Sequence, residues 1–198
     1  MKIYMIRHAR SQANEAKVWT GWQDIPLSDK GVAEQMAICE VFSYPRAELY
    51  FSSPLLRCIQ SFEIIYGHSL DYISEELCEC SLGALEGRPY INLDDDPNYV
   101  EWITFQEKQI EGGESFREFT ERACRGFERL LLHIREKGLS SAAGTLHGNV
   151  MRAILHRFAD PRIPHGEWRI PNGGMYVLDF DEEMRLSSWD TAPDFLFK

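Results

Sequence analysis

The feature that most constrains the fold is an apolar run near the start of the chain that ends in two polar residues. Residues 3–6 (IYMI) are followed directly by Arg7 and His8. A short apolar run of this kind is typical of a strand buried in a sheet. In open α/β sheets, ligands bind beyond the carboxyl ends of the strands. The run therefore predicts an α/β fold with a candidate site at Arg7 and His8.

The chemistry of these two side chains indicates phosphoryl transfer. The neutral imidazole of His8 can attack an electrophile near pH 7 without first losing a proton. The planar, permanently charged guanidinium group of Arg7 matches the oxygens of a phosphate group. This stretch alone leaves an alternative open, which is a strand end with two solvated polar residues.

A second predicted strand ends in the same way. Residues 49–51 (LYF) predict a strand, and Pro54 fits the first turn of the helix that follows. Arg57 then lies one turn into this helix. The carboxyl ends of parallel strands meet at one edge of a sheet. We therefore expect Arg7 and Arg57 to hold one phosphoryl group between them.

A third predicted strand also ends in a histidine. Residues 142–146 (AAGTL) are small and apolar, as in a central buried strand, and His147 follows them. The next residues predict a helix, so the amides of Gly148 and Asn149 would lie at a helix N-terminus, where anions bind readily. We expect His147 to lie beside His8 and to donate to the phosphoryl oxygens.

Two further helices predict how the sheet is covered. Ser28 is a good N-cap for a helix beginning at Asp29, whose predicted apolar face consists of Val32, Met36, Ile38, Val41 and Phe42. Residues 116–137 predict a long helix that Gly138 ends. Its predicted apolar face consists of Phe119, Ala123, Phe127, Leu130, Leu131 and Ile134. Residues 175–180 and 185–189 predict two strands joined by a hairpin turn.

Composition narrows the class of protein. A chain of 198 residues with a formal net charge of −10 has no basic surplus for nucleic acid, so we expect no such partner. No segment approaches a membrane-spanning length of apolar residues, and no secretory signal is evident. We therefore expect no membrane partner and a cytoplasmic location. The five scattered cysteines are interpreted as reduced thiols rather than zinc ligands.

Five motifs together resemble a known family. They are Arg7-His8, residues 52–61 (SSPLLRCIQS), residues 79–87 (ECSLGALEG), residues 112–115 (GGES) and residues 146–149 (LHGN). In this order and at this spacing they resemble the histidine phosphatase superfamily, the phosphoglycerate-mutase-like proteins. The resemblance runs over residues 2–177 and covers nearly the whole chain.

The resemblance implies both a fold and a reaction. The fold is a three-layer α/β/α sandwich with a mainly parallel, mixed central sheet, in one domain over residues 1–198. The reaction is hydrolysis of a small phosphate ester through a phosphohistidine at His8, with Glu79 as the proton donor. Arg7, Arg57 and His147 would hold the phosphoryl oxygens, and neither a metal nor another cofactor would be needed.

The substrate-binding residues are expected around this centre. In the mutase branch, the segment that corresponds to residues 20–28 lines the pocket, so Thr20 and the amide of Gly21 become candidate donors, and Asn14 another. Trp22 is interpreted as a packing anchor under this loop. Arg10 would be a cation at the pocket rim that favours substrates with a second anionic group. Its alternative is an exposed side chain or one paired with a local carboxylate.

Two rival functions remain open. A phosphoglycerate-type mutase would carry a basic insert after the Glu79 motif, whereas residues 92–99 (NLDDDPNY) are acidic. If they faced the pocket, the carboxylates of Asp94, Asp95 and Asp96 would repel a second phosphate, and this favours a phosphatase over a mutase. The same three residues could also form a Mg²⁺ site, but a solvated loop is the better interpretation. A non-catalytic phosphate-binding protein is the other rival, because Ala9 and Arg10 replace the family's usual Gly and Glu or Gln. A homodimer is left open as the assembly.

Overall fold

The computed structural model describes residues 1–90 and 97–197, and the architecture follows from one mixed sheet of six strands. The order across the sheet is β3-β2-β4-β1-β5-β6. The strands are β1 (Lys2–Arg7), β2 (Leu49–Ser52), β3 (Tyr72–Ile73), β4 (Ser141–Leu146), β5 (Met175–Phe180) and β6 (Leu186–Ala192). The first four are mutually parallel, while β5 and β6 form an antiparallel hairpin at one side. The predicted mainly parallel, mixed sheet is confirmed.

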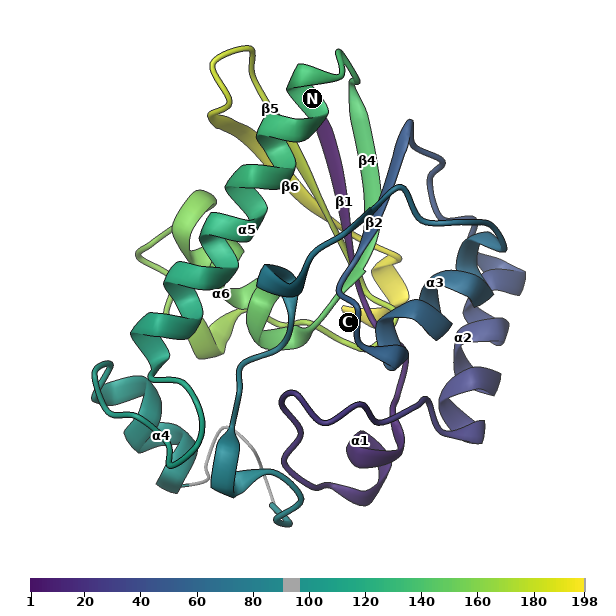
Figure 1. Cartoon of the computed structure of the whole chain (residues 1–198). Coiled ribbons are helices and arrows are strands. Elements are labelled where there is room, and N and C mark those ends of the chain that lie inside the picture. Colours follow the sequence, from purple (N-terminus) through teal and green to yellow (C-terminus); the bar gives the residue numbers. More distant parts are fainter. Residues whose placement is uncertain (91–96, 198) are drawn as a thin grey trace.

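Helices cover both faces of this sheet. Figure 1 shows α5 and α6 over one face and α2 and α3 over the other, with α1 and α4 beyond the carboxyl ends of the parallel strands. The helices are α1 (Gln12–Ala16), α2 (Asp29–Val41), α3 (Leu56–Tyr66), α4 (Pro97–Thr104), α5 (Phe116–Glu136) and α6 (Gly148–Phe158). Short 3₁₀ turns are η1 (Glu75–Leu77), η2 (Gly83–Leu85), η4 (His165–Glu167) and η5 (Asp194–Leu196). These layers form the predicted three-layer sandwich.

The central strand β1 sets the position of the candidate site. It pairs in parallel with β4 and antiparallel with β5, so it is enclosed on both edges. Ile3, Met5 and Ile6 are fully buried, as expected for a strand covered by helices on both faces. Arg7 lies opposite Leu146 in this register. The residues that follow the two strands, His8 and His147, are therefore neighbours at the same edge of the sheet.

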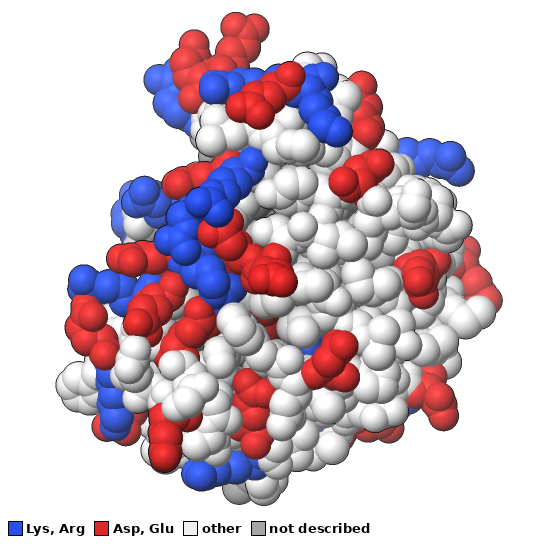
Figure 2. Space-filling model, in the orientation of Figure 1, with Lys and Arg blue, Asp and Glu red and all other residues white. Residues whose placement is uncertain are grey.

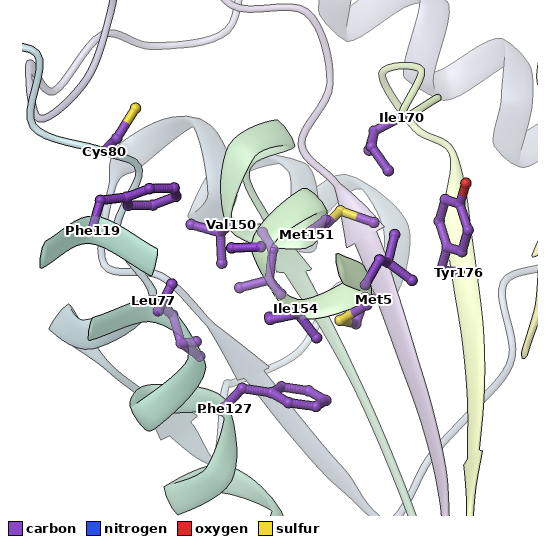
Figure 3. Close-up of a cluster of buried hydrophobic side chains, with 14 of the residues drawn as sticks. Met5, Leu77, Cys80, Phe119, Phe127, Val150, Met151, Ile154, Ile170 and Tyr176 are labelled. Carbon is purple, nitrogen blue, oxygen red and sulfur yellow. The ribbon is translucent and has the colours of Figure 1, made fainter. Parts of the chain in front are cut away.

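The core lies between the sheet and the pair α5 and α6. Figure 3 shows Met5 of β1 close to Ile154 of α6 and Phe127 of α5 within one apolar cluster. The predicted apolar face of α5 is fully buried. Gly138 follows this helix with φ of 67°, a conformation that glycine adopts at low cost. The helix ends where the sequence predicts.

Two local predictions are wrong. The buried positions of α2 are Gly31 and Gln35, whereas Met36 and Val41 of the predicted apolar face are 55% and 74% exposed. Gly31 faces inward because the carbonyl oxygen of Arg10 lies against it, where a Cβ atom would be only 1.9 Å away. Pro54 precedes α3 instead of occupying its first turn, since the helix begins at Leu56 after the N-cap Leu55.

The surface carries charges of both signs. Figure 2 shows lysine and arginine interleaved with aspartate and glutamate on the side where α5 runs, while much of the opposite half of this view is uncharged. Arg125 and Arg129 of α5 both pair with Glu76, for example. Within residues 1–90 and 97–197, no helix has the length and apolar character required to cross a membrane.

Candidate active site

A cavity of about 270 Å³ opens at the ends of β1 and β4. The lining residues are Arg7, His8, Ser11, Asn14, Val18, Trp19, Thr20, Arg57, Glu79, Leu82, Tyr90, Gly148, Asn149, Arg152 and Ile170. They come from segments far apart in the sequence, and they bring four of the five predicted catalytic side chains to one place. The fifth, His147, is adjacent to His8 but does not line the cavity.

His8 is held in one tautomer. Its ring Nδ1 lies 2.7 Å from the carbonyl oxygen of Ala9, and because a carbonyl only accepts, Nδ1 carries the hydrogen. The lone pair is then on Nε2. Burial lowers the pKa of His8 well below its ordinary value, and the positive charges of Arg57 and Arg7 lower it further. His8 is therefore a neutral imidazole with one nitrogen available for attack at neutral pH.

The main chain around His8 is fixed on both sides. The carbonyl oxygen of His8 accepts a 2.8 Å hydrogen bond from the side-chain amide of Asn172. The backbone N–H of Ala9 donates to Ser61 Oγ at 2.8 Å, and Ser61 lies on α3 one turn after Arg57. Helix α3 thus positions both the arginine and the segment that carries the histidine.

Both arginines are anchored by main-chain carbonyls. Arg7 Nη1 donates to the carbonyl oxygen of Ile170. Arg57, only 2% exposed, donates to the carbonyl oxygens of Gly21 at 2.8 Å and Gln23 at 3.0 Å. Burial lowers the pKa of Arg7 to about 10, with the nearby charge of Arg152 acting in the same direction. Arg7 and Arg57 therefore line the cavity that His8 enters with two anchored positive charges, and Arg152 lines it as well.

His147 packs against His8 from within the protein. The two ring centroids are 5.3 Å apart at an interplanar angle of 62°. His147 is fully buried, and its Nε2 lies 2.8 Å from Ser53 Oγ. Burial first, and then the charge of Arg57, lower its pKa well below the ordinary histidine value. The placement of His147 beside His8 is as predicted, but its ring is turned to a serine instead of the cavity.

Glu79 is oriented by two backbone amides. Its Oε1 accepts from the N–H of Cys80 at 2.9 Å, and its Oε2 accepts from the N–H of Asn149 at 3.4 Å. The second amide belongs to the first turn of α6, where a negative charge is favoured by the helix dipole. The Asn149 amide is thus directed at Glu79, whereas Gly148 lies close to the guanidinium group of Arg7.

The other predicted substrate-binding residues divide into two groups. Asn14 and Thr20 line the cavity. Asn14 Oδ1 accepts from the N–H of Ser11 within a capping box, so its amide nitrogen is the donor left for a ligand. Gly21 does not line the cavity. A Cβ atom at Gly21 would lie 2.3 Å from the carbonyl oxygen of Cys80, and its own carbonyl holds Arg57.

Arg10 lies outside the cavity, and its predicted place at the rim is wrong. Its Nε donates to Glu34 Oε2 of α2 at 2.8 Å, so the side chain is directed away along α2. The pairing with a local carboxylate, which the sequence left as the alternative, is the one observed. Asp94, Asp95 and Asp96 fall outside the described residues, and the expectations that rest on them are not tested.

The sequence reasoning missed several lining residues, of which Ser11, Tyr90 and Arg152 are polar. Arg152 lies on α6, three positions after Asn149, and residues at this spacing share a helix face. That spacing was the available signal. Arg152 donates to the carbonyl oxygen of Trp168 at 3.2 Å and to the hydroxyl of Tyr99 at 3.3 Å. Tyr90 follows a loop and carries no comparable sequence signal.

The described residues contain no group of three histidine, cysteine or carboxylate side chains that could hold a metal ion. The titratable and charged groups that line the cavity include a neutral imidazole, guanidinium groups and one acidic side chain. This arrangement can bind a phosphoryl group between Arg7 and Arg57, place a nucleophilic nitrogen against it and supply a carboxyl group for proton transfer.

Comparison with known proteins agrees with this chemistry. The sequence pattern of the histidine phosphatase superfamily (branch 1) matches residues 3–190. A 2,3-bisphosphoglycerate-dependent phosphoglycerate mutase of Gloeothece citriformis is 26% identical over 230 aligned positions, which cover 94% of this chain and 97% of the mutase. An adenosylcobalamin/alpha-ribazole phosphatase of Salmonella typhimurium is 27% identical over 135 positions, covering 66% of this chain and 67% of that protein.

A solved structure extends the similarity to the fold. The phosphoglycerate mutase from Thermus thermophilus superposes with a TM-score of 0.69 at 30% identity, covering 96% of this chain and 98% of that one. The predicted phosphoglycerate-mutase-like architecture is confirmed. Proteins named for two different reactions are thus similar to this chain, so the similarity identifies the family and not the reaction. The chain belongs to branch 1 of the histidine phosphatase superfamily.

Proposed function

We propose that this chain is a phosphomonoesterase that hydrolyses a small phosphorylated metabolite through a phosphohistidine at His8. The observation that carries the proposal is the hydrogen bond from His8 Nδ1 to the carbonyl oxygen of Ala9. It leaves the Nε2 lone pair of a neutral, buried imidazole in a cavity that three arginines line. A nucleophile of this kind needs no metal and no separate base to activate it.

The reaction proceeds in two displacements. In the first, His8 Nε2 forms a bond to phosphorus while the bond from phosphorus to the ester oxygen breaks, and Glu79 gives its proton to the departing oxygen. In the second, water attacks the phosphohistidine, Glu79 takes a proton from that water, and the bond from nitrogen to phosphorus breaks. The products are an alcohol and inorganic phosphate, and both side chains return to their starting forms.

The cationic groups lower the barrier by stabilising charge on the phosphoryl oxygens. Arg7 and Arg57 are pre-positioned by carbonyl oxygens, so little reorganisation is needed when the substrate binds. Charge-assisted hydrogen bonds of this kind contribute about 1.5–3 kcal/mol each. In this proposal His147, held by Ser53, limits the movement of the His8 ring against which it packs.

The cavity wall supports a small organic ester as the substrate. Beside its polar groups it includes the apolar side chains of Val18, Trp19, Leu82 and Ile170. Apolar side chains suit an organic group. The volume of about 270 Å³ is below the ~300–1,000 Å³ of drug-sized pockets. We therefore propose a compact phosphorylated metabolite.

A phosphoglycerate-type mutase is the second candidate, and the relatives named as mutases favour it. The alignment with the mutase of Gloeothece citriformis has 230 positions, more than the 198 residues of this chain, so that mutase contains residues without a counterpart here. We propose that the difference removes contacts that a mutase needs for its bisphosphate. A phosphate-binding protein without turnover is the third possibility.

One experiment separates the three. Purified protein is incubated with a panel of small phosphomonoesters, and released inorganic phosphate is measured. In parallel, interconversion of 2- and 3-phosphoglycerate is followed with 2,3-bisphosphoglycerate present. Phosphate release without interconversion supports the phosphatase. Interconversion at a higher kcat/KM than any hydrolysis supports the mutase, and binding without either product supports the third possibility.

Location and assembly remain proposals. A cytoplasmic enzyme fits five scattered thiols, which persist in a reducing compartment. A homodimer and the absence of a nucleic-acid partner remain predictions.

A further inference from the structure

Arg122 of α5 holds the segment that carries Glu79, and it uses every hydrogen that a guanidinium group has. Its Nε and Nη2 donate to the two carboxylate oxygens of Glu114 at 2.6 and 2.7 Å. Its Nη1 donates to the carbonyl oxygens of Glu76 and Cys78 at 2.9 and 3.0 Å. Its Nη2 also donates to the carbonyl oxygen of Glu79 at 3.1 Å. Five N–H donors therefore meet five acceptors.

Aromatic rings enclose this guanidinium group. Its central carbon lies 5.5 Å from the centroid of the Trp22 ring and 5.6 Å from that of Phe119. Trp22, predicted as a packing anchor under its loop, does make these packing contacts, although it is 50% exposed. Its indole N–H donates to the carbonyl oxygen of Glu79 at 2.6 Å. The carbonyl oxygen of Glu79 therefore accepts from Arg122 and Trp22 together.

The Gly-Gly-Glu-Ser motif supports the same contact. Gly112 has φ of 69°, which favours glycine, and a Cβ atom at Gly113 would lie 2.5 Å from the carbonyl oxygen of Ser81. This close approach lets Glu114 exchange two hydrogen bonds of 2.9 Å with Ser81, one through its own N–H and one through its carboxylate. Ser115 then caps α5. The motif joins the start of α5 to the residues just after Glu79.

Apolar contacts hold the same segment from its other side. Leu77 and Cys80 are fully buried and belong to the same cluster as Phe119 of α5, as Figure 3 shows. Glu79 lies between them and is 7% exposed. With Leu77 and Cys80 directed into the core and the main-chain carbonyls of the segment bound to Arg122, the side chain of Glu79 is left to face the cavity.

We propose that Arg122, paired with Glu114, is a positioning residue for the proton donor Glu79. The inference rests on the proposed function, in which Glu79 protonates the departing oxygen. Arg122 does not line the cavity and does not touch the phosphoryl group. It acts by holding the carbonyl of Glu79, while the amides of Cys80 and Asn149 orient the carboxyl group at the other end of the same residue.

The proposal predicts a loss that depends on the leaving group. An alkyl phosphate releases a strongly basic oxygen and needs the proton from Glu79, whereas 4-nitrophenyl phosphate releases a stable phenolate and needs it far less. A displaced Glu79 should therefore slow the alkyl ester selectively. General acid catalysis contributes about 10²–10⁴ in rate. We expect Arg122→Lys, which has three donors for five acceptors, to lose at least about tenfold more kcat/KM on the alkyl ester than on the nitrophenyl ester. The comparison uses kcat/KM because this constant reports the first displacement, whereas the second displacement is the same for both esters.

Matched variants test the same contact in other ways. Trp22→Phe keeps an aromatic side chain but removes the indole N–H that donates to the carbonyl oxygen of Glu79. This variant should show the same selectivity with a smaller magnitude. Glu114→Gln weakens the partner of Arg122 and should resemble Arg122→Lys. Arg125→Gln is the control, because exposed Arg125 of the same helix binds only the side chain of Glu76. Arg125→Gln should leave kcat/KM unchanged for both esters.

The outcomes decide between the inference and the proposed function. Glu79→Gln is the reference variant, and its loss of kcat/KM must itself be larger for the alkyl ester than for the nitrophenyl ester. If Glu79→Gln lowers kcat/KM equally for both esters, the proton-donor role in the proposed function is wrong. The other case is that Glu79→Gln lowers kcat/KM selectively for the alkyl ester, whereas Arg122→Lys and Trp22→Phe lower kcat/KM equally for both esters. Arg122 is then only structural, and the inference is overturned. Should Arg122→Lys fail to fold, Trp22→Phe and Glu114→Gln give the same decision.

Discussion

The rings of His8 and His147 lie 5.3 Å apart because Arg7 and Leu146 are paired in the parallel register of β1 and β4. Each histidine is the first residue after its strand. The pairing of the strands therefore brings the two rings together without any loop between them. A shift of this register by one residue would reverse the face of every side chain on β1. The buried residues of the sheet thus determine the geometry of the site.

Replacement of His8 should abolish turnover. In the proposed mechanism His8→Ala removes the nitrogen that attacks phosphorus, so we expect kcat to fall at least about a thousandfold. Acid-labile, alkali-stable phosphoenzyme should be detected in rapidly quenched wild-type reactions and be absent from the variant. His68→Gln changes an exposed histidine and should retain full activity. Substantial hydrolysis by His8→Ala would overturn the covalent mechanism.

The protonation of His8 can be measured directly. Its pKa is lowered by burial and by Arg57 and Arg7, so the ring should remain neutral at pH values where a free imidazole, with a pKa of about 6.5, is protonated. Ring ¹⁵N chemical shifts, assigned with His8→Ala, should show the Nδ1–H tautomer from pH 8 down to pH 5.5. A titration midpoint near 6.5 would contradict this prediction.

The lowered pKa values of His8 and His147 should make the folded protein less stable in acid. Below about pH 6.5 the unfolded chain binds a proton at His8 and at His147, whereas the folded chain does not. The unfolded state then binds more protons, and the free energy of unfolding falls as the pH is lowered. Above that pH both states are neutral at these positions, so they contribute no pH dependence. Urea unfolding of wild type and of His147→Gln between pH 5 and 8 measures this slope, which should be smaller in the variant.

Activity should not require a metal ion. Arg7 and Arg57 supply the positive charge that a divalent cation would otherwise provide at the phosphoryl oxygens. We expect kcat and KM to be unchanged after dialysis against excess EDTA. Loss of activity that Mg²⁺ restores would contradict the prediction and would direct attention to Asp94, Asp95 and Asp96.

Gly21 should tolerate no side chain. A Cβ atom there would lie 2.3 Å from the carbonyl oxygen of Cys80 and 2.8 Å from the amide nitrogen of Leu82, both of them backbone atoms. Gly21→Ala must displace the loop whose carbonyl holds Arg57. We expect about 1–3 kcal/mol of lost stability in urea unfolding, together with a raised KM.

Gly166 provides the matched control. A Cβ atom at Gly166 meets no atom within 4 Å. Gly166→Ala should therefore leave both the unfolding midpoint and KM near the wild-type values. If the two substitutions had equal effects, the close backbone contact at Gly21 would not be the cause of the lost stability.

The parts of the fold that depend on residue patterns within a single strand or helix could be predicted from the sequence. The strand before Arg7 and the apolar face of α5 follow from periodicity alone, because burial on one side selects apolar residues at fixed spacing. Four lining side chains with expected catalytic roles, Arg7, His8, Arg57 and Glu79, were also named from their motifs. Arg7 and His8 lie at the end of β1, Arg57 lies in the first turn of α3, and Glu79 follows η1.

The predictions that failed depend on contacts between distant segments. Helix α2 buries Gln35 because its amide donates to the hydroxyl of Tyr44, a pairing that apolar periodicity does not contain. Arg10 is directed to Glu34, which lies 24 positions away. The five acceptors of Arg122 include three main-chain carbonyls, and no sequence pattern marks a carbonyl oxygen as an acceptor. Such contacts require the folded arrangement.

The enclosed position of β1 has a consequence for how the chain reaches its native state. Its neighbours β4 and β5 come from the last third of the sequence, and Met1 and Phe180, 179 positions apart, share a hydrogen bond. As the ribosome releases the chain, the apolar side chains of Ile3, Met5 and Ile6 emerge long before either partner strand exists. Pairings of such long sequence separation slow folding and prolong exposure to aggregation. We therefore expect the candidate active site to assemble only after residue 180 has left the exit tunnel. Nascent chains that end earlier should depend on chaperones to avoid aggregation.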